Sequence, residues 1–195
     1  MVAFAESDVR RFALDKIITV LAPEARVISV KEQTRGAACT ALLFAAWIDN
    51  GEELLIVNGN EFLDVSFGGV IADFRERELD AGVVVFPSIH PRYSFVRTDI
   101  RGFVVEAAEK KPISRDATAG FYWFARGRDF VEAAKNMIRK DARVNDAFYV
   151  CPSLNEMILK NARIGVHRIE AAKFHPLKTE RQVLHYESQT ELARR

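Results

Sequence analysis

The sequence has few cysteines and no excess of charge of either sign, and each shortage excludes a class of protein. Only two cysteines, Cys39 and Cys151, occur among 195 residues, and their spacing is not that of a zinc site. A disulfide scaffold and a cysteine-ligated metal centre are therefore not expected, and both thiols should be free in a reducing compartment. The 28 basic and 27 acidic side chains leave a net charge of +1. With so small a net charge we expect no binding to nucleic acid or to a membrane surface.

Long apolar runs are also missing. None approaches the roughly 20 residues that cross a bilayer. The first residues, MVAFAESDVRRF, meet charge too early to form the apolar stretch of a signal peptide. We therefore expect a cytoplasmic protein. The length and the 49% hydrophobic content fit one soluble domain, which we place at residues 1–186, followed by a polar C-terminal tail at 187–195.

Short apolar runs alternate with helical patterns along the chain. Strands are expected at 25–30, 54–57, 83–86, 94–98, 103–107, 117–124 and 165–171. Helices are expected between Ser7 and Pro23 and at 36–48, 66–80, 129–140, 153–161 and 180–186. This alternation predicts a three-layer α/β/α, Rossmann-like domain with a mixed, mostly parallel sheet. Ligands of such sheets bind beyond the carboxyl ends of the strands, which here include the segment 58–61.

The stretch LLIVNGNEFLDV, residues 54–65, raises a chemical question. A buried strand runs into the polar turn Asn58-Gly59-Asn60, where metal and phosphate chemistry is usually placed. Such chemistry normally needs a carboxylate at the strand tip, whereas Asn60 is a neutral amide. The turn therefore has three interpretations: a working site, a damaged site, or a structural turn only.

Most other motifs are weak when taken alone. The run Glu109-Lys110-Lys111-Pro112 has two readings, a solvated charged loop or a loop that presents a lysine to a phosphate. The proline favours extended backbone before it, which suits the second reading. His90, in SIHPRY, is most simply a structural loop histidine. Neither a Ser/His/Asp constellation nor a P-loop is visible in the sequence.

Six segments together carry a resemblance that no one of them would carry. In order along the chain they are GAACTALL, LLIVNGNEFLDV, FPSIHPRYSFV, VVEAAEKKPIS, ATAGFYWF and VNDAFYVCPSLNEMI. This set resembles the sugar-phosphate nucleotidyltransferases, and more closely the branch found with bacterial capsule and lipopolysaccharide synthesis genes. The resemblance covers about residues 1–186. It implies the nucleotide-diphospho-sugar transferase fold and transfer of a nucleotide to a sugar 1-phosphate with Mg²⁺, releasing pyrophosphate.

The resemblance assigns one group of residues to the nucleotide. Gly36 and Ala37 match the turn that packs against the base and ribose, where the small residues let the ring approach the backbone. Asn58, at the end of the strand at 54–57, completes the nucleotide-binding set that the resemblance implies.

A second group is assigned to the sugar phosphate. Ser94, Glu109 and Gly120 match positions around the sugar, with Glu109 accepting hydroxyl groups. Lys111 or Lys110, between which the spacing does not decide, would neutralise the phosphate as the catalytic lysine. Such a transfer depends on positioning and charge neutralisation more than on covalent chemistry.

The sequence departs from the family pattern in four places. A Gly-rich GxGxR loop with its PK pair is missing, so we expect an N-terminally truncated form of the fold. Asn60 stands where the family has a metal-binding aspartate, and Ala147 stands where a sugar-binding glutamate is common. The segment FHPLKTER lacks a second aspartate that some members have. Because a neutral amide is a poor ligand for Mg²⁺, we expect at most weak Mg²⁺ binding. Glu61 or Asp64 could rescue metal binding, although strand geometry directs neither obviously inward.

These features predict a nucleotidyltransferase-like domain with a degenerate site. In this reading the protein binds a sugar phosphate or a nucleotide sugar, or associates with a true synthase. An alternative is an active transferase that another chain completes, and a third is an inactive remnant that still folds. We also expect a homodimer or a partner chain that covers the incomplete sheet edge near Val2–Phe4.

Overall fold

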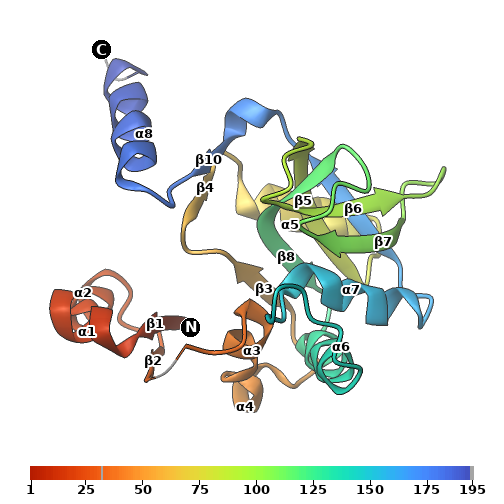
Figure 1. The fold of residues 1–195 in the computed structure, drawn as a ribbon, viewed down its shortest axis with the longest axis horizontal. Coiled ribbons are helices and arrows are strands. Elements are labelled where there is room, and N and C mark those ends of the chain that lie inside the picture. Colours follow the sequence, from red (N-terminus) through yellow and green to blue (C-terminus); the bar gives the residue numbers. More distant parts are fainter. Residues whose placement is uncertain (32, 194–195) are drawn as a thin grey trace.

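Strands and helices alternate along the chain in the computed structural model, which describes residues 1–31 and 33–193 (Figure 1). The strands are β1 (Val2–Ala5), β2 (Val27–Val30), β3 (Leu54–Val57), β4 (Glu61–Leu63), β5 (Ala81–Pro87), β6 (Ser94–Thr98), β7 (Val104–Glu109), β8 (Asp116–Phe124), β9 (Ile164–Arg168) and β10 (Phe174–Pro176). The helices are α1 (Glu6–Phe12), α2 (Leu14–Leu21), α3 (Ala37–Leu42), α4 (Ala45–Ile48), α5 (Phe67–Glu76), α6 (Gly127–Arg139), α7 (Val150–Ile158), the short 3₁₀ helix η1 (Ala171–Lys173) and α8 (Glu180–Ala193).

A mixed sheet of six strands forms the centre of the described chain. Its order is β7-β6-β8-β5-β9, and β3 pairs with the second half of β8. The strands β3, β5, β6 and β9 run in one direction, and β7 and β8 run against them. The expected α/β class is confirmed. Neighbouring strands are mostly antiparallel, because β8 lies between strands that run in the opposite direction to it. Strands β5 and β9 form the parallel pair of this sheet.

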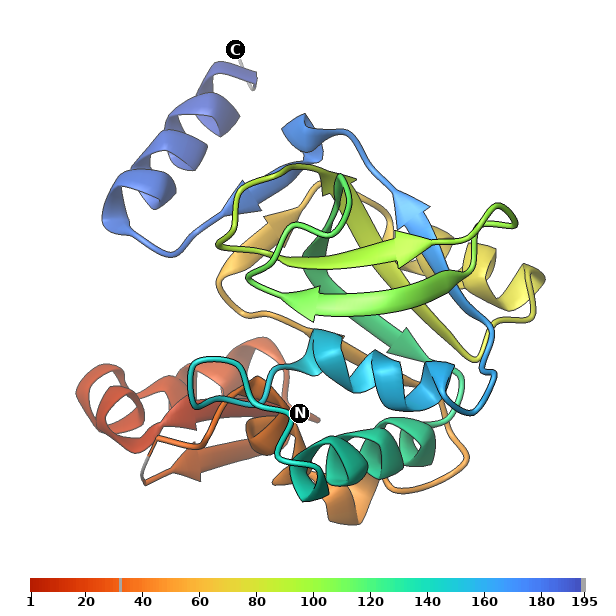
Figure 2. The same ribbon diagram turned by 45° about the vertical axis from the view of Figure 1, so that its right-hand side comes forward.

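Helices cover both faces of this sheet, as the three-layer prediction requires. Side chains of a strand alternate between faces, so Val83 and Val85 join the core under α6 and α7, whereas Val84 joins the core under α5. On the α5 side Phe74 stacks on Trp123 with ring centroids 5.7 Å apart. Figure 2 shows α6 and α7 lying side by side beneath the sheet.

The N-terminal segment forms a small unit beside the central sheet. Strands β1 and β2 pair in parallel as a separate two-stranded sheet, with α1 and α2 next to them (Figure 1, red). The single helix expected between Ser7 and Pro23 is wrong, because Ala13 takes a left-handed conformation (φ 50°) that ends α1 and begins α2. The helix expected at 36–48 is likewise divided into α3 and α4.

The C-terminal boundaries also differ from the sequence pattern. Helix α8 continues to Ala193 instead of ending at Tyr186, so the tail expected from residue 187 is helical as far as it is described. Residues 194–195 lie outside the described residues, and the division at residue 186 stays a prediction. In the described part of the chain, no helix is both long and apolar enough to cross a membrane.

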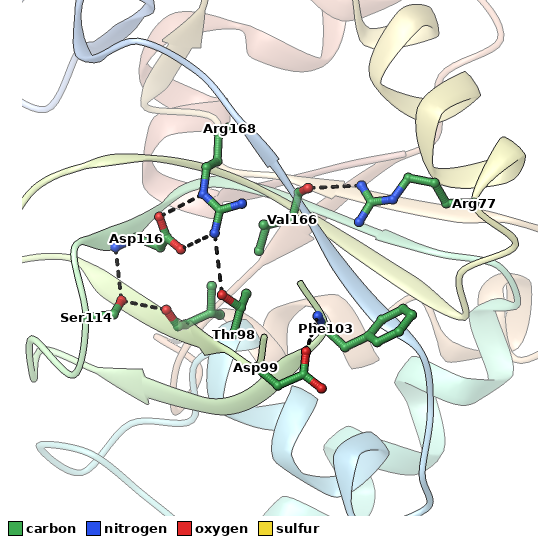
Figure 3. A network of polar contacts seen from close by, with 9 residues as sticks. Arg77, Thr98, Asp99, Phe103, Ser114, Asp116, Val166 and Arg168 are labelled. Carbon is green, nitrogen blue, oxygen red and sulfur yellow. Dashed lines mark hydrogen bonds and ion pairs between the residues drawn. The ribbon is translucent and has the colours of Figure 1, made fainter. Parts of the chain in front are cut away.

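A polar network ties three strands of the sheet together (Figure 3). Arg168, at the end of β9, donates to both carboxylate oxygens of Asp116 at 2.8 and 3.3 Å and to the Thr98 hydroxyl at 3.5 Å. The Ser114 hydroxyl donates to the carbonyl of Val96 at 2.6 Å and accepts from the Asp116 backbone N–H at 3.0 Å. These bonds join the end of β9, the start of β8 and β6, which fixes the strands that carry the polar pocket described below.

The loss of stability on truncating a large apolar side chain should distinguish a core position from a surface position. Phe130, on α6, is fully buried and its ring centroid lies 5.1 Å from that of Phe124. We expect Phe130→Ala to lower the free energy of unfolding by about 3–5 kcal/mol. Ile89→Ala is the control, because Ile89 is 67% exposed in the loop after β5 and its loss should cost about 0.5 kcal/mol or less. Urea titrations in which the two variants lose equal stability would contradict the placement of this core.

Candidate functional site

A polar pocket of about 260 Å³ opens where β3 and β7 end. Its lining comes from strands of the sheet, from the starts of α3 and α7, and from the segment that follows β10. The lining residues are Ala37, Asn58, Glu61, Arg92, Tyr93, Ser94, Glu109, Lys110, Thr118, Tyr122, Tyr149, Val150 and Lys178.

Five of the residues that the sequence analysis selected meet in this pocket. They are Ala37, Asn58, Ser94, Glu109 and Lys110. They come from four segments, namely the start of α3, the turn after β3, the start of β6 and the end of β7, so the selection reflects a shared location in the fold. Their roles toward a ligand stay predictions.

Gly120 lies behind the pocket and shapes it from the backbone. It has φ 67°, and β8 contains a bulge here, because β5 pairs through Val83 with Tyr122 but through Val85 with Thr118. A Cβ at Gly120 would overlap the Glu61 carboxylate and lie 2.6 Å from the amide nitrogen of Asn58. Glycine is therefore required because two pocket side chains approach the β8 backbone closely.

Gly36 is required by packing within the protein. Its φ is 108°, and a Cβ there would collide with the backbone of Phe148, 2.7 Å from the nitrogen. The Phe148 carbonyl accepts from the N–H of Ala38 at 3.0 Å, which holds the start of α3 against the segment before α7. Of the two residues assigned to the nucleotide turn, Ala37 therefore lines the pocket and Gly36 supports it.

Glu109 and Ser94 form a buried hydrogen-bonded pair. They are opposite each other in the β6–β7 register, and the Ser94 hydroxyl donates to the Glu109 carboxylate. Glu109 is only 7% exposed, and burial raises the pKa of its carboxyl group. The Ser94 hydrogen bond and the ammonium groups of Lys110 and Lys178 oppose this rise in pKa, whereas the Glu61 carboxylate adds to it. Glu109 is thus a hydrogen-bond acceptor held in a poorly hydrated position.

Of the two candidate lysines, the geometry favours Lys110. Lys110 has a left-handed backbone (φ 54°), and its ammonium donates to the Tyr149 hydroxyl at 2.8 Å while lying 4.9 Å from that ring's centroid. The hydrogen bond to Tyr149 raises the pKa of Lys110, so the side chain is a positive charge at neutral pH. Lys111 is exposed and does not line the pocket.

The sequence analysis missed an ion pair at the base of the pocket. The Glu61 side chain is 4% exposed, and its carboxylate lies 2.8 Å from the ammonium of Lys178 and accepts from the Asn58 amide at 3.0 Å. The expectation that Glu61 does not point inward is wrong, because the turn at 58–60 interrupts the strand and β4 begins anew at Glu61. Asp64 is exposed, as expected. Pairing of Glu61 with Pro176 across β4 and β10 brings Lys178 to the pocket.

Arg92 and Tyr149 were also not selected. Arg92 follows His90, whose ring accepts from the Arg92 backbone N–H at 3.2 Å. Both residues lie within segments that carry the family resemblance, SIHPRY and VNDAFYV, which was the signal that could have indicated them.

A divalent cation does not fit the donors of this pocket. Mg²⁺ prefers free carboxylates and water in octahedral geometry. Here the Glu61 oxygens are engaged by Lys178 and Asn58, and Glu109 accepts from the Ser94 hydroxyl. Asn60 is exposed and outside the pocket lining. Among the described residues, no group of three or more His, Cys, Asp or Glu side chains is arranged to hold a metal.

A mixed sheet with helices on both faces, and a polar pocket beyond the ends of β3 and β7, give this chain an α/β/α fold of the Rossmann-like kind. The fold is similar to that of a nucleoside-diphosphate-sugar pyrophosphorylase from Vibrio cholerae, with a TM-score of 0.75 and 22% identity over 92% of this chain and 75% of that chain. It is also similar to a candidate glucose-1-phosphate thymidylyltransferase from Bacillus anthracis in complex with sucrose, with a TM-score of 0.66 and 13% identity over 90% and 71% of the two chains. No family model and no curated protein matches the sequence.

The buried carboxyl group predicts a pH dependence of stability. Burial raises the pKa of Glu109 in the folded protein, so between the ordinary and the raised pKa the folded state binds more protons than the unfolded state. The stability that protonated Glu109 contributes is therefore fully present below the ordinary glutamate pKa of about 4.3, and it is lost as pH rises through the raised pKa. Glu109→Gln keeps an acceptor for Ser94 and cannot ionise. We expect the melting temperature of the variant, relative to the wild type, to increase from about pH 4 to about pH 7. A constant or decreasing difference would contradict the pKa direction.

Proposed function

We propose that the pocket binds a sugar phosphate, or the sugar-phosphate end of a nucleotide sugar, and that the chain acts by binding and not by nucleotide transfer. The observation that supports this most directly is the combination of cations with a buried Ser–Glu pair in one pocket. That combination matches the two parts of a phosphorylated sugar.

The cations suit the phosphate. The pocket is lined by Lys110, Lys178 and Arg92, which come from three separate segments. Lysine supplies a compact positive charge and arginine a planar set of donors, and both are common phosphate-binding groups. Tyr149 and Glu61 orient the two lysines by the contacts described above.

The Ser94–Glu109 pair suits the sugar. A carboxylate accepts hydrogen bonds from hydroxyl groups, and Glu109 has capacity beyond the one bond from Ser94. Because Glu109 is buried at the pocket wall and poorly hydrated, a sugar hydroxyl would supply its carboxylate with a hydrogen bond that water supplies poorly there. A ligand without hydroxyl groups would cover the Glu109 carboxylate without donating to it, so the pocket should bind such a ligand more weakly.

The size of the pocket favours a sugar phosphate over an entire nucleotide sugar. Pockets for larger organic ligands usually have about 300–1,000 Å³, and this one has about 260 Å³. The nucleotide part of a larger ligand would extend past exposed Ala37 at the rim.

Binding without transfer follows from the poor fit of a divalent cation. Phosphoryl and nucleotidyl transfer depend on neutralising the charge of the reacting phosphates, which is the usual task of Mg²⁺. We also propose that the protein acts in the cytoplasm, in the supply of sugar nucleotides for capsule or lipopolysaccharide synthesis. This part of the proposal rests on the resemblance of the six sequence segments.

Ligand titrations test the proposed role of the pocket. Glucose 1-phosphate, UDP-glucose, inorganic phosphate and glucose are titrated into the protein by calorimetry and thermal shift. A charge-assisted contact contributes about 1.5–3 kcal/mol, so Lys110→Ala should weaken the phosphorylated sugars about ten- to hundredfold. Lys135→Ala is the control, because that exposed lysine pairs with Asp49 outside the pocket. A large loss with Lys111→Ala and none with Lys110→Ala would contradict the assignment.

Pyrophosphate release, followed for pairs of nucleoside triphosphates and sugar 1-phosphates, separates binding from transfer. We expect no turnover by the isolated chain. Sustained turnover would support the alternative of an active transferase, and a screen in which no phosphorylated sugar binds would overturn the proposed function.

The N-terminal unit is proposed as the place where a second chain associates. Helices α1 and α2 have no buried residue, and their exposed apolar side chains include Phe12, Ile17, Val20 and Leu21. Parallel sheets are normally covered on both faces, whereas the two-stranded parallel sheet of β1 and β2 has no fully buried residue, although Ala3 and Ile28 pack against the neighbouring core. A second copy or another chain would bury this surface.

Light scattering tests this association. We expect the wild type to form a dimer or larger species at micromolar concentration, and Leu21→Lys to shift it toward the monomer, because Leu21 is 75% exposed and lies on the same face of α2 as Ile17. Ile100→Lys is the matched control, since Ile100 is fully exposed in the turn between β6 and β7. A wild type that is monomeric throughout would rule out self-association through this surface.

A further inference from the structure

The Glu61 carboxylate is enclosed on three sides at the base of the pocket. The ammonium of Lys178 lies 2.8 Å from one of its oxygens, and the Asn58 amide donates to the other oxygen at 3.0 Å. The backbone at Gly120 is close behind, since even a Cβ there would overlap the carboxylate. A carboxylate that is only 4% exposed needs a counter-charge, because burial of an unpaired charge is costly.

The chain around Lys178 is held on both sides of this contact. Before it, the N–H of Leu177 donates to the carbonyl of Asn60 at 2.8 Å and continues the pairing of β4 with β10 (Figure 1). After it, the Lys178 backbone N–H donates to the Gln182 side chain at 2.9 Å, which joins the segment to the first turn of α8. The Lys178 side chain is 40% exposed and lines the pocket, so its ammonium faces Glu61 and also the space that a ligand would occupy.

We infer that Lys178 is a built-in cation that takes the place a divalent metal has in phosphate-binding pockets. It neutralises Glu61 and presents its remaining N–H donors to a phosphate. The pocket should therefore bind its ligand without a metal, and Glu61 should be unavailable to a metal as long as Lys178 is present. The ligand half of this inference rests on the proposed function, whereas the metal half concerns the protein alone.

Manganese binding without any sugar tests the metal half. Mn²⁺ is titrated into the wild type and into Lys178→Met, with free Mn²⁺ followed by electron paramagnetic resonance. Removal of the ammonium frees a carboxylate oxygen of Glu61 beside Asn58, so we expect Mn²⁺ to bind the variant at least about tenfold more tightly than the wild type. Thermal melting of each variant in the same buffers shows whether it is folded.

Two further variants make the result specific. Lys140→Met is the matched control, because Lys140 also lies 2.8 Å from a mostly buried glutamate, Glu156, but outside the pocket. It should gain no Mn²⁺ affinity. The double variant Glu61→Gln with Lys178→Met should lose the gain in Mn²⁺ affinity, because the freed oxygen then belongs to a neutral amide. It also leaves no unpaired charge at the base of the pocket, so it can fold even if Lys178→Met does not. A tight Mn²⁺ site in the wild type, or equal affinity in wild type and Lys178→Met, would overturn the inference.

Glucose 1-phosphate titrations test the ligand half. We expect the same affinity in the wild type in EDTA and in excess Mg²⁺, within about twofold, and an affinity that depends on Mg²⁺ in Lys178→Met. Binding by the wild type that requires Mg²⁺ would overturn the inference while supporting the proposal that the pocket binds a sugar phosphate. No binding under either condition would overturn the proposed function, and the Mn²⁺ result would still decide whether Lys178 blocks the metal.

Discussion

The bulge in β8 is the constraint on which the rest of this molecule depends. At Gly120 the strand takes a left-handed conformation and changes its neighbour, from β6 at Ala117 to β3 at Phe121. This change lets one strand join both halves of the sheet while the Gly120 carbonyl accepts from the N–H of Asn58 at 2.9 Å. The ends of β3 and β7 then meet at one place, and the space beside the bulge is filled by polar side chains and not by a Cβ.

Charge in the pocket is balanced within the protein. Two buried or nearly buried carboxylates, Glu61 and Glu109, are accompanied by the cations Lys110, Lys178 and Arg92. A carboxyl group whose pKa is raised by burial lowers the free energy of unfolding at neutral pH. Glu109 therefore destabilises the fold, which a residue with a purely structural role would not need to do. Such a cost is typical of positions kept for binding, and it is compatible with a pocket that accepts sugar hydroxyl groups.

Fold and chemistry separate in this chain. The likeness to two solved structures, at 22% and 13% identity, concerns the path of the backbone. In the pocket itself, Lys178 and the Asn58 amide engage the two carboxylate oxygens of Glu61 at the start of β4, and Asn60 is exposed outside the pocket lining. The proposed function therefore assigns the phosphate of a sugar phosphate to fixed positive charges in place of a divalent cation.

The sequence alone determined the strands β3 and β5 to β9, because alternating and continuous apolar runs such as those at 54–57 and 83–86 report burial directly, whereas the three-residue strand β4 was not predicted. It also selected Ser94 and Glu109, which the β6–β7 register makes opposite neighbours. Tertiary structure decided the division of the first helix at Ala13 and the position of Lys110, not Lys111, at the pocket, since each residue, Ala13 and Lys110, has a left-handed backbone that no pattern reveals. It alone also decided the Glu61–Lys178 contact, because the two residues are brought together by the pairing of β4 with β10, and a distant pairing leaves no period in the sequence.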